Sequence, residues 1–245
     1  MTNPFDECSG EYARYRPGYP AEFFDYLTSA CRLDERAPVL DVGAGTGKAS
    51  APLADRGIPV ISVEPSLAMA RQGVQFYSNL RYTAATADTL PFSAGMFSLV
   101  IAAQSFHWFS PETTLPEFAR VLTKRGHFAV FWNSRDRTKE CVRDFEDLIR
   151  LFNPQHKVSY RMKDWSAVIA SGGLFRILDQ RQFSQTVPMT MPDWIGLSRS
   201  VSYIRSIGGD KMPKFERALE KRLSIYSSLD CPYVTDVWLA ETNYD

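Results

Sequence analysis

Three glycines at alternate positions follow a short apolar run in the stretch LDVGAGTGKAS, residues 40–50. Gly43, Gly45 and Gly47 favour neither a strand nor a helix, so they predict a turn in which the backbone closely approaches another group. An acid, Asp41, stands two residues before the first glycine. A carboxylate at this position would repel a pyrophosphate, but it suits a ligand that carries an ammonium group.

Two further carboxylates follow later apolar runs of the chain. Glu64 stands about twenty residues beyond the glycines, where a carboxylate can accept two hydrogen bonds from a ribose diol. Asp88, next to Ala87, follows the third run, where it can bind an adenine amino group. Either acid alone is more often a solvated loop residue. At consecutive strand ends, together with Asp41 and the glycines, they predict a site for a ligand that contains a nucleoside.

The spacing of the glycines argues against two common nucleotide motifs. The dinucleotide pattern G-x-G-x-x-G fails because its last glycine would fall at position 48, which is Lys48. In the phosphate-binding pattern G-x-x-x-x-G-K-[ST], Ala49 takes the place of the hydroxyl that binds magnesium, and position 42 is not glycine. The pattern that remains is D-x-G-x-G-x-G, which disfavours a nicotinamide oxidoreductase.

Short runs rich in β-branched residues predict the elements that position these side chains. Buried strands are expected at residues 39–42, 58–63, 80–85, 97–103 and 127–132. Helices are expected between them at residues 48–56, 66–77 and 112–122. Gly57 and Gly126 stand where the residue after a helix end is expected. The alternation predicts an α/β fold with a doubly wound, mostly parallel sheet, whose ligands bind at the carboxyl ends of the strands.

The second half of the chain has a different pattern. Residues 135–152 and 213–229 predict helices, and residues 189–209 predict helical fragments. Residues 175–187 and 234–241 predict two late strands that bring the sheet to seven. We expect a single domain over residues 1–245, with a ligand-binding core at 12–133. The segments 135–174 and 188–210 are expected to form a small helical cover over the substrate.

Composition bounds the function classes. The chain has 245 residues, and its 28 basic residues balance its 28 acidic residues, so no net charge attracts nucleic acid or an anionic membrane. The four cysteines are far apart and have no ligand spacing, which predicts thiols and no metal site. The N-terminus does not resemble a secretory signal, and no apolar run has the ~18 residues of a membrane span. We therefore expect a soluble cytoplasmic protein.

The motifs of residues 12–133 resemble those of a known enzyme family. DVGAGTG, VEP at 63–65, ADTLPF at 87–92 and AAQSFHWF after the fourth strand are similar to class I S-adenosylmethionine-dependent methyltransferases, in the branch called methyltransferase type 11. The N-terminal YARYRPGYP resembles the Y-x-x-x-R-P-x-Y-P segment of trans-aconitate-methyltransferase-like members. The resemblance implies S-adenosyl-L-methionine as cofactor.

Carried over to this chain, the resemblance assigns a role to each motif residue. It places Gly43, Gly45 and Gly47 at the methionine moiety and Asp41 at its amino group. Glu64 would bind the ribose hydroxyls, and Ala87 and Asp88 the adenine. The remaining assignments are Gln104 on the methionine side, with Tyr12 and Arg16 closing over the cofactor, where an arginine can pair with the methionine carboxylate.

The resemblance leaves the chemistry of the acceptor open. A sulfonium donor is already activated, so the enzyme needs a base only when the acceptor must lose a proton. His107 follows the fourth strand and is the tentative catalytic residue; the alternative is a wall residue of the pocket. The tentative substrate contacts are Trp108, Trp132, Asn133, Trp194 and Tyr203.

The leading prediction is a methyltransferase that acts on a small molecule, at a carboxylate or hydroxyl oxygen. Methylation of nucleic acid is less favoured, because AAQSF lacks the Asn/Asp-Pro-Pro-aromatic motif of amino-group base methylases. A protein that binds the cofactor without transferring its methyl group stays open as an alternative, since function is set by the site and not by the fold. We expect no nucleic-acid or membrane partner, and the acceptor's identity and the oligomeric state stay open.

Overall fold

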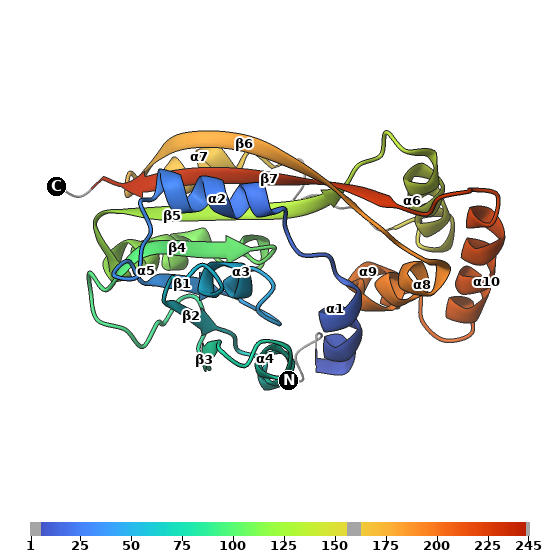
Figure 1. The fold of residues 1–245 in the computed structure, drawn as a ribbon, viewed down its shortest axis with the longest axis horizontal. Coiled ribbons are helices and arrows are strands. Elements are labelled where there is room, and N and C mark those ends of the chain that lie inside the picture. Colours follow the sequence, from blue (N-terminus) through green and yellow to red (C-terminus); the bar gives the residue numbers. More distant parts are fainter. Residues whose placement is uncertain (1–5, 156–162, 244–245) are drawn as a thin grey trace.

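The computed structural model describes residues 6–155 and 163–243, and these residues form a seven-stranded sheet with helices on both faces (Figure 1). The strand order is β3-β2-β1-β4-β5-β7-β6. The strands are β1 (Val39–Val42), β2 (Val60–Val63), β3 (Arg81–Thr83), β4 (Phe97–Ala103), β5 (Leu122–Arg135), β6 (Phe175–Val187) and β7 (Cys231–Thr242). β7 is antiparallel to both β5 and β6, whereas β1 to β5 pair in parallel. The predicted α/β fold is confirmed.

Alternate side chains of the central strands pack into two apolar layers. On β4, Leu99 and Ile101 join a cluster with α2 (Ala21–Ala30) and α3 (Ser50–Ala54). Val100 and Ala102 join the opposite cluster, which includes α5 (Pro111–Val121) and α7 (Trp165–Ala170). This period of two places every residue of β1 and nearly all of β4 out of contact with water, as a strand covered on both faces requires.

A third apolar cluster lies at one end of the sheet (Figure 1). It contains α6 (Glu140–Phe152), α8 (Met191–Ser200), α9 (Ser202–Arg205) and α10 (Lys211–Leu223), with the first residues of β7. The N-terminal α1 (Ser9–Tyr15) packs closely on α8, since a Cβ at Gly196 would overlap the Tyr15 ring. The helical cover was predicted at residues 135–174 and 188–210. α7 lies within the first segment but packs on the sheet and not in this cluster. α10 lies outside both segments and is part of the cluster.

Strand bounds predicted from apolar runs match the structure for β1, β4 and β6. The assignment of Gly126 was wrong, because β5 begins at Leu122 and Gly126 lies inside this strand. A register shift between Phe97 and Leu99 lets β4 pair with Leu122, the first residue of this longer strand, and then with residues 127–131. α6 begins at Glu140 because the residues up to Arg135 still pair with β7.

Two expectations from composition can be compared with the described residues. The four cysteines, all of which lie in the described ranges, are buried thiols that form no disulfide. No helix in the described residues has the length and apolar character needed to cross a bilayer.

α4 (Leu67–Phe76), which follows β2, begins at a Ser66 cap whose hydroxyl accepts a hydrogen bond from the Met69 backbone.

Candidate functional site

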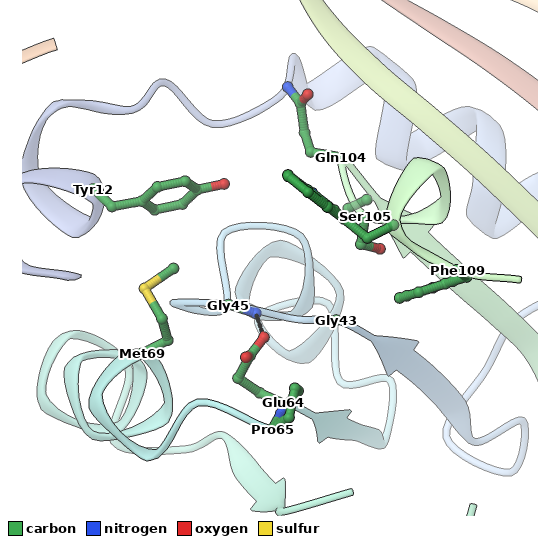
Figure 2. A pocket seen from close by; sticks show the side chains of 11 residues that line it. Tyr12, Gly43, Gly45, Glu64, Pro65, Met69, Gln104, Ser105 and Phe109 are labelled. Carbon is green, nitrogen blue, oxygen red and sulfur yellow. Dashed lines mark hydrogen bonds between the residues drawn. The ribbon is translucent and has the colours of Figure 1, made fainter. Parts of the chain in front are cut away.

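A cavity of about 260 Å³ lies at the carboxyl ends of β1, β2 and β4 (Figure 2). The strand order reverses here, because β2 and β3 extend the sheet on one side of β1 and β4 continues it on the other side. This is the edge at which open parallel sheets bind ligands. Its walls come from α1, the loop after β1, the β2–α4 connection and the segment after β4. The lining residues are Tyr12, Gly43, Gly45, Glu64, Pro65, Met69, Ala103, Gln104, Ser105, Trp108 and Phe109.

A second cavity of about 300 Å³ lies next to the first. The two share Gly43, Pro65, Trp108 and Phe109 as walls. Ala87 and Asp88, predicted from sequence as the adenine end, line the second cavity with Thr86. The Asp88 side chain is exposed, and a hydrogen bond from Thr86 lowers the pKa of its carboxyl group, which keeps it ionised. The structure therefore places the predicted ribose residue and the predicted adenine residues in two adjacent cavities.

The three glycines of the loop after β1 have different reasons to be glycine. All three have positive φ, at +71°, +57° and +80° for Gly43, Gly45 and Gly47. A Cβ at Gly43 would lie 2.7 Å from the Cβ of Ser105, and one at Gly47 would overlap Leu80. A Cβ at Gly45 would meet only the flexible end of Met69, at 3.3 Å. Close packing within the protein thus accounts for two glycines, whereas at Gly45 the space beside the backbone is limited only by a flexible side-chain end.

Glu64 connects the two loops that frame the cavity. Its Oε2 accepts a hydrogen bond from the Gly45 amide at 2.8 Å (Figure 2). Its Oε1 accepts one from the Ser66 amide at 2.8 Å. Burial raises the pKa of this carboxyl group, and the two amides oppose that shift. Each carboxylate oxygen has a second lone pair, so Glu64 can hold the loop and still accept hydrogen bonds from a ligand.

Asp41 lies in β1 behind the glycine loop and lines neither cavity. Its side chain is fully buried, and its Oδ2 accepts a 2.6 Å hydrogen bond from Ser50, whose hydroxyl also bonds Ser62. Among the described residues nothing donates a hydrogen bond to its Oδ1. Burial raises the pKa of Asp41 to about 7, with a smaller contribution from Glu64. A buried carboxylate with an orphan oxygen suits a cationic neighbour.

Asp41→Asn is expected to stabilise the ligand-free protein at pH 8 and to leave its stability at pH 4 unchanged. Between pH 3.8 and about 7 the unfolded chain has lost the Asp41 proton while the folded chain retains it, so stability falls as pH rises through this window. Asparagine removes that loss, which is at most about 4 kcal/mol at ~1.36 kcal/mol per pKa unit. Urea unfolding from pH 4 to pH 8 measures it. The exposed Asp88→Asn is the control, and a less stable Asp41→Asn at pH 8 would contradict the assignment.

Two cationic side chains lie near the Tyr12 end of the cavity. The Arg16 guanidinium stands over the Tyr12 ring at 5.2 Å, and its Nη2 donates to the Ser200 carbonyl of α8. Its Nε is buried, and no acceptor for it lies among the described residues. Burial, and then the nearby Arg16 charge, lower the pKa of Lys48 to about 8. A carboxylate bound here would find two donors, of which sequence reasoning named only Arg16.

The segment after β4 supplies residues that the sequence only partly revealed. Gln104 has a left-handed backbone with φ +58°. Its backbone N–H donates to the Phe131 carbonyl, and its side-chain Nε2 donates to the Asn133 carbonyl. Ser105 donates to the Val42 carbonyl at 2.8 Å. Neither Ser105 nor Phe109 was predicted, although both lie within five residues of Gln104. The signal for them was their position directly after a buried strand.

His107 lies in η2 (Phe106–Trp108), the short turn that follows Ser105. Its ring centroid is 5.0 Å from that of Trp108, whose exposed side chain lines both cavities. The Trp132 indole donates to His107 Nδ1 at 3.2 Å. His107 and Trp132 are absent from the walls of both cavities described above. His107 is connected to them only through its neighbour Trp108, which lines both.

The structure does not bring the other predicted substrate contacts to these cavities. Trp194 is fully buried, packs on Phe145 with a centroid distance of 4.8 Å and donates to the Leu229 carbonyl, so it is a core residue of the third cluster. Tyr203 accepts a hydrogen bond from Arg135. Asn133 is buried, donates to the Gly18 carbonyl and accepts from Thr235. Aromatic and amide side chains satisfy such packing roles equally well, which is why the sequence could not separate them from ligand contacts.

Comparison with known proteins agrees with this geometry. A family model described as "Methyltransferase domain" matches residues 40–130, which contain the glycine loop and β4. An uncharacterized methyltransferase of Mycobacterium tuberculosis is 30% identical over 199 residues, covering 77% of this chain and 80% of the relative.

Two solved structures share the fold. One from Anaeromyxobacter dehalogenans, assigned as a type II methyltransferase, has a TM-score of 0.66 at 23% identity and covers 94% of this chain and 98% of its own. The [4+2]-cyclase SpnF has a TM-score of 0.55 at 19% identity and covers 94% of this chain and 85% of its own. At these identities the likeness concerns the fold alone. The assignment to a family rests on the relative from Mycobacterium tuberculosis. The chain belongs to the class I S-adenosylmethionine-dependent methyltransferases.

Proposed function

We propose that this protein transfers a methyl group from S-adenosylmethionine to a carboxylate or hydroxyl oxygen of a small molecule. The observation that carries the proposal is the first cavity, whose wall contains both Gly45 and the carboxylate of Glu64. Asp88 lines the second cavity, which shares walls with the first. The family supplies the cofactor class.

Each part of the cofactor has a matching group in this chain. Gly43, Gly45, Gly47 and Gln104 would surround the methionine chain, Asp41 with its orphan oxygen would face the ammonium group, and Glu64 would bind the ribose hydroxyls. Ala87 and Asp88 would hold the adenine, and Tyr12 and Arg16 would close over the carboxylate end. When bound, the cofactor supplies an electrophilic methyl group on a sulfonium.

A small acceptor fits the rest of the molecule. The chain carries no net charge, which offers no general attraction for a polyanion. The helical cluster of α6 and α8–α10 reaches the site through α1, since Arg16 follows α1 and contacts Ser200 of α8. We propose that this cluster shapes the acceptor side of a single domain whose cofactor core spans residues 12–133; residues 156–162 of the predicted cover lie outside the described residues.

Calorimetry is expected to show binding of S-adenosylmethionine or S-adenosylhomocysteine, with NAD bound far more weakly. Asp41, the acid of D-x-G-x-G-x-G, is buried directly behind the loop on which a pyrophosphate would lie, and its carboxylate would repel the phosphates. Tight NAD binding with none for the methyl donor would overturn the proposal.

Metabolite extracts incubated with methyl-labelled cofactor would then identify the acceptor. A labelled product whose mass exceeds that of its precursor by one methylene is expected. Binding of the cofactor without any labelled product would favour the alternative, in which the chain uses the cofactor without methyl transfer. A solved [4+2]-cyclase has a similar fold, so the fold by itself does not decide between these two possibilities.

A further inference from the structure

Hydrogen bonds from two neighbouring strands hold the peptide groups on both sides of Gly45. The Gly45 N–H donates to Oε2 of Glu64, which directly follows β2, over 2.8 Å. The Gly45 carbonyl accepts a hydrogen bond from the Tyr82 hydroxyl of β3 over 3.2 Å. Glycine has the greatest backbone freedom of all residues. These two bonds therefore restrict a backbone that would otherwise be mobile, and they hold it at a φ of +57°.

The Tyr82 ring reaches this carbonyl because two glycines leave room for it. A Cβ at Gly73, in α4, would overlap the Tyr82 hydroxyl and would lie 2.6 Å from Cζ of the ring. A Cβ at Gly47 would lie 2.8 Å from the same hydroxyl. Glycine is disfavoured inside a helix, and the backbone of Gly73 does not have the positive φ that would require it. The close approach of the phenol therefore explains why α4 contains a glycine at this position.

The Tyr82 hydroxyl is a hydrogen-bond donor, and it lies outside the ligand site. Burial, followed by the charges of Asp41 and Glu64, raises the pKa of this phenol, so the hydroxyl keeps its proton and can donate it to the Gly45 carbonyl. Tyr82 is half-buried and lines neither cavity, whereas Gly45 lines the first. An effect of Tyr82 on a ligand is thus transmitted through the backbone of Gly45.

We propose that Tyr82 is a positioning residue for S-adenosylmethionine, which holds the carbonyl side of Gly45 so that the glycine loop has its binding conformation before the cofactor arrives. The inference rests on the proposed function, because it concerns the same cofactor. Gly73 is part of the arrangement, since its missing Cβ admits the phenol. A loop that is already ordered in the free protein loses less conformational entropy on binding, which raises the affinity. Tyr82 and Gly73 lie in none of the sequence motifs described above.

Removal of the hydroxyl alone tests this role. Tyr82→Phe is expected to raise the Kd of S-adenosylhomocysteine in calorimetry roughly three- to tenfold, the range that corresponds to the loss of one hydrogen bond between uncharged groups. Tyr77→Phe is the matched control, because Tyr77 also packs beside Gly47 and its hydroxyl has no hydrogen bond among the described residues. An unchanged Kd in Tyr82→Phe, or an equal rise in both variants, would overturn the proposal.

A second pair of variants separates positioning from packing. Tyr82→Leu removes the hydroxyl together with part of the ring, and Gly73→Ala added to it places a methyl group in the space that the phenol leaves. The double variant is expected to melt at a higher temperature than Tyr82→Leu, also because alanine is favoured over glycine inside a helix. Its Kd is expected to stay as weak as that of Tyr82→Phe. Return of the wild-type Kd in the double variant would mean that Tyr82 only fills space, which contradicts the assignment.

Amide hydrogen exchange of the ligand-free protein measures the loop directly. The Gly45 amide is expected to exchange faster in Tyr82→Phe than in the wild-type protein and in Tyr77→Phe, because the loop opens more easily when one of its two bonds is lost. Equal exchange rates in all three proteins would refute an ordering role for Tyr82. Absence of any S-adenosylhomocysteine binding by the wild-type protein would instead contradict the proposed function, so the two failures are distinguishable.

Discussion

Gly45→Val is expected to abolish binding of S-adenosylmethionine while the sheet remains folded. The new Cβ would project toward the cavity, 3.3 Å from the end of the Met69 side chain, and the two methyl groups of valine would fill the space where the ligand meets the backbone. Calorimetry would measure the loss of binding, and thermal unfolding would measure the stability of the variant.

The comparison needs a control because Gly45 has a φ of +57°. A β-branched residue in this region is strained by about 1–2 kcal/mol, whatever the ligand requires. Gly57→Val is the matched variant: Gly57 has a φ of +78°, and a Cβ there would have no heavy atom within 4 Å. Both variants should melt at similarly reduced temperatures, and only Gly45→Val should lose the cofactor. Normal binding by Gly45→Val would refute close approach of the ligand to this loop.

Glu64→Ala is expected to weaken cofactor binding at least tenfold without unfolding the protein. A carboxylate that accepts two hydroxyl hydrogen bonds contributes roughly 1.5–3 kcal/mol for each charge-assisted bond, before water compensates. A tenfold change corresponds to about 1.4 kcal/mol, so partial compensation still leaves a measurable loss. The variant also leaves the Gly45 and Ser66 amides without their acceptor, which loosens both walls of the cavity.

Glu64→Gln separates the loss of hydrogen bonds to the ligand from the loss of support for the two loops. The amide keeps one acceptor oxygen, but its NH₂ group must face one of the two backbone N–H groups, so the loop is perturbed while the shape of the side chain is preserved. Glu241→Gln is the control, a buried carboxylate that pairs with Arg125 and Arg176 and lines neither cavity. A dissociation constant in Glu64→Ala equal to that of the wild-type protein would mean that this acid only supports the loop.

Much of the site could be predicted because its signals are local in the sequence. Gly43, Gly45 and Gly47 announce a backbone turn, and the apolar runs before Glu64 and Gln104 mark the ends of buried strands. In a parallel sheet the carboxyl ends of neighbouring strands lie at one edge, so residues far apart in the chain converge there by topology alone.

Other features depend on packing between distant segments, which no local pattern encodes. The sequence gives three equivalent glycines, and only the positions of Ser105 and Leu80 show that two of them serve the protein's own packing. Trp132 and Trp194 have the same side chain, yet one bonds to His107 beside the cavity and the other is enclosed in the helical cluster.

Sequence by itself therefore determined the fold class and predicted that Glu64 and Asp88 lie at one edge of the sheet, where both line cavities. Only the tertiary structure decided which side chain His107 contacts, where Arg16 lies, and which aromatic residues are core. The physical reason is that hydrophobic periodicity depends on near neighbours along the chain, whereas a hydrogen bond such as Trp132 to His107 joins side chains 25 residues apart through the packing of β5 against the turn after β4.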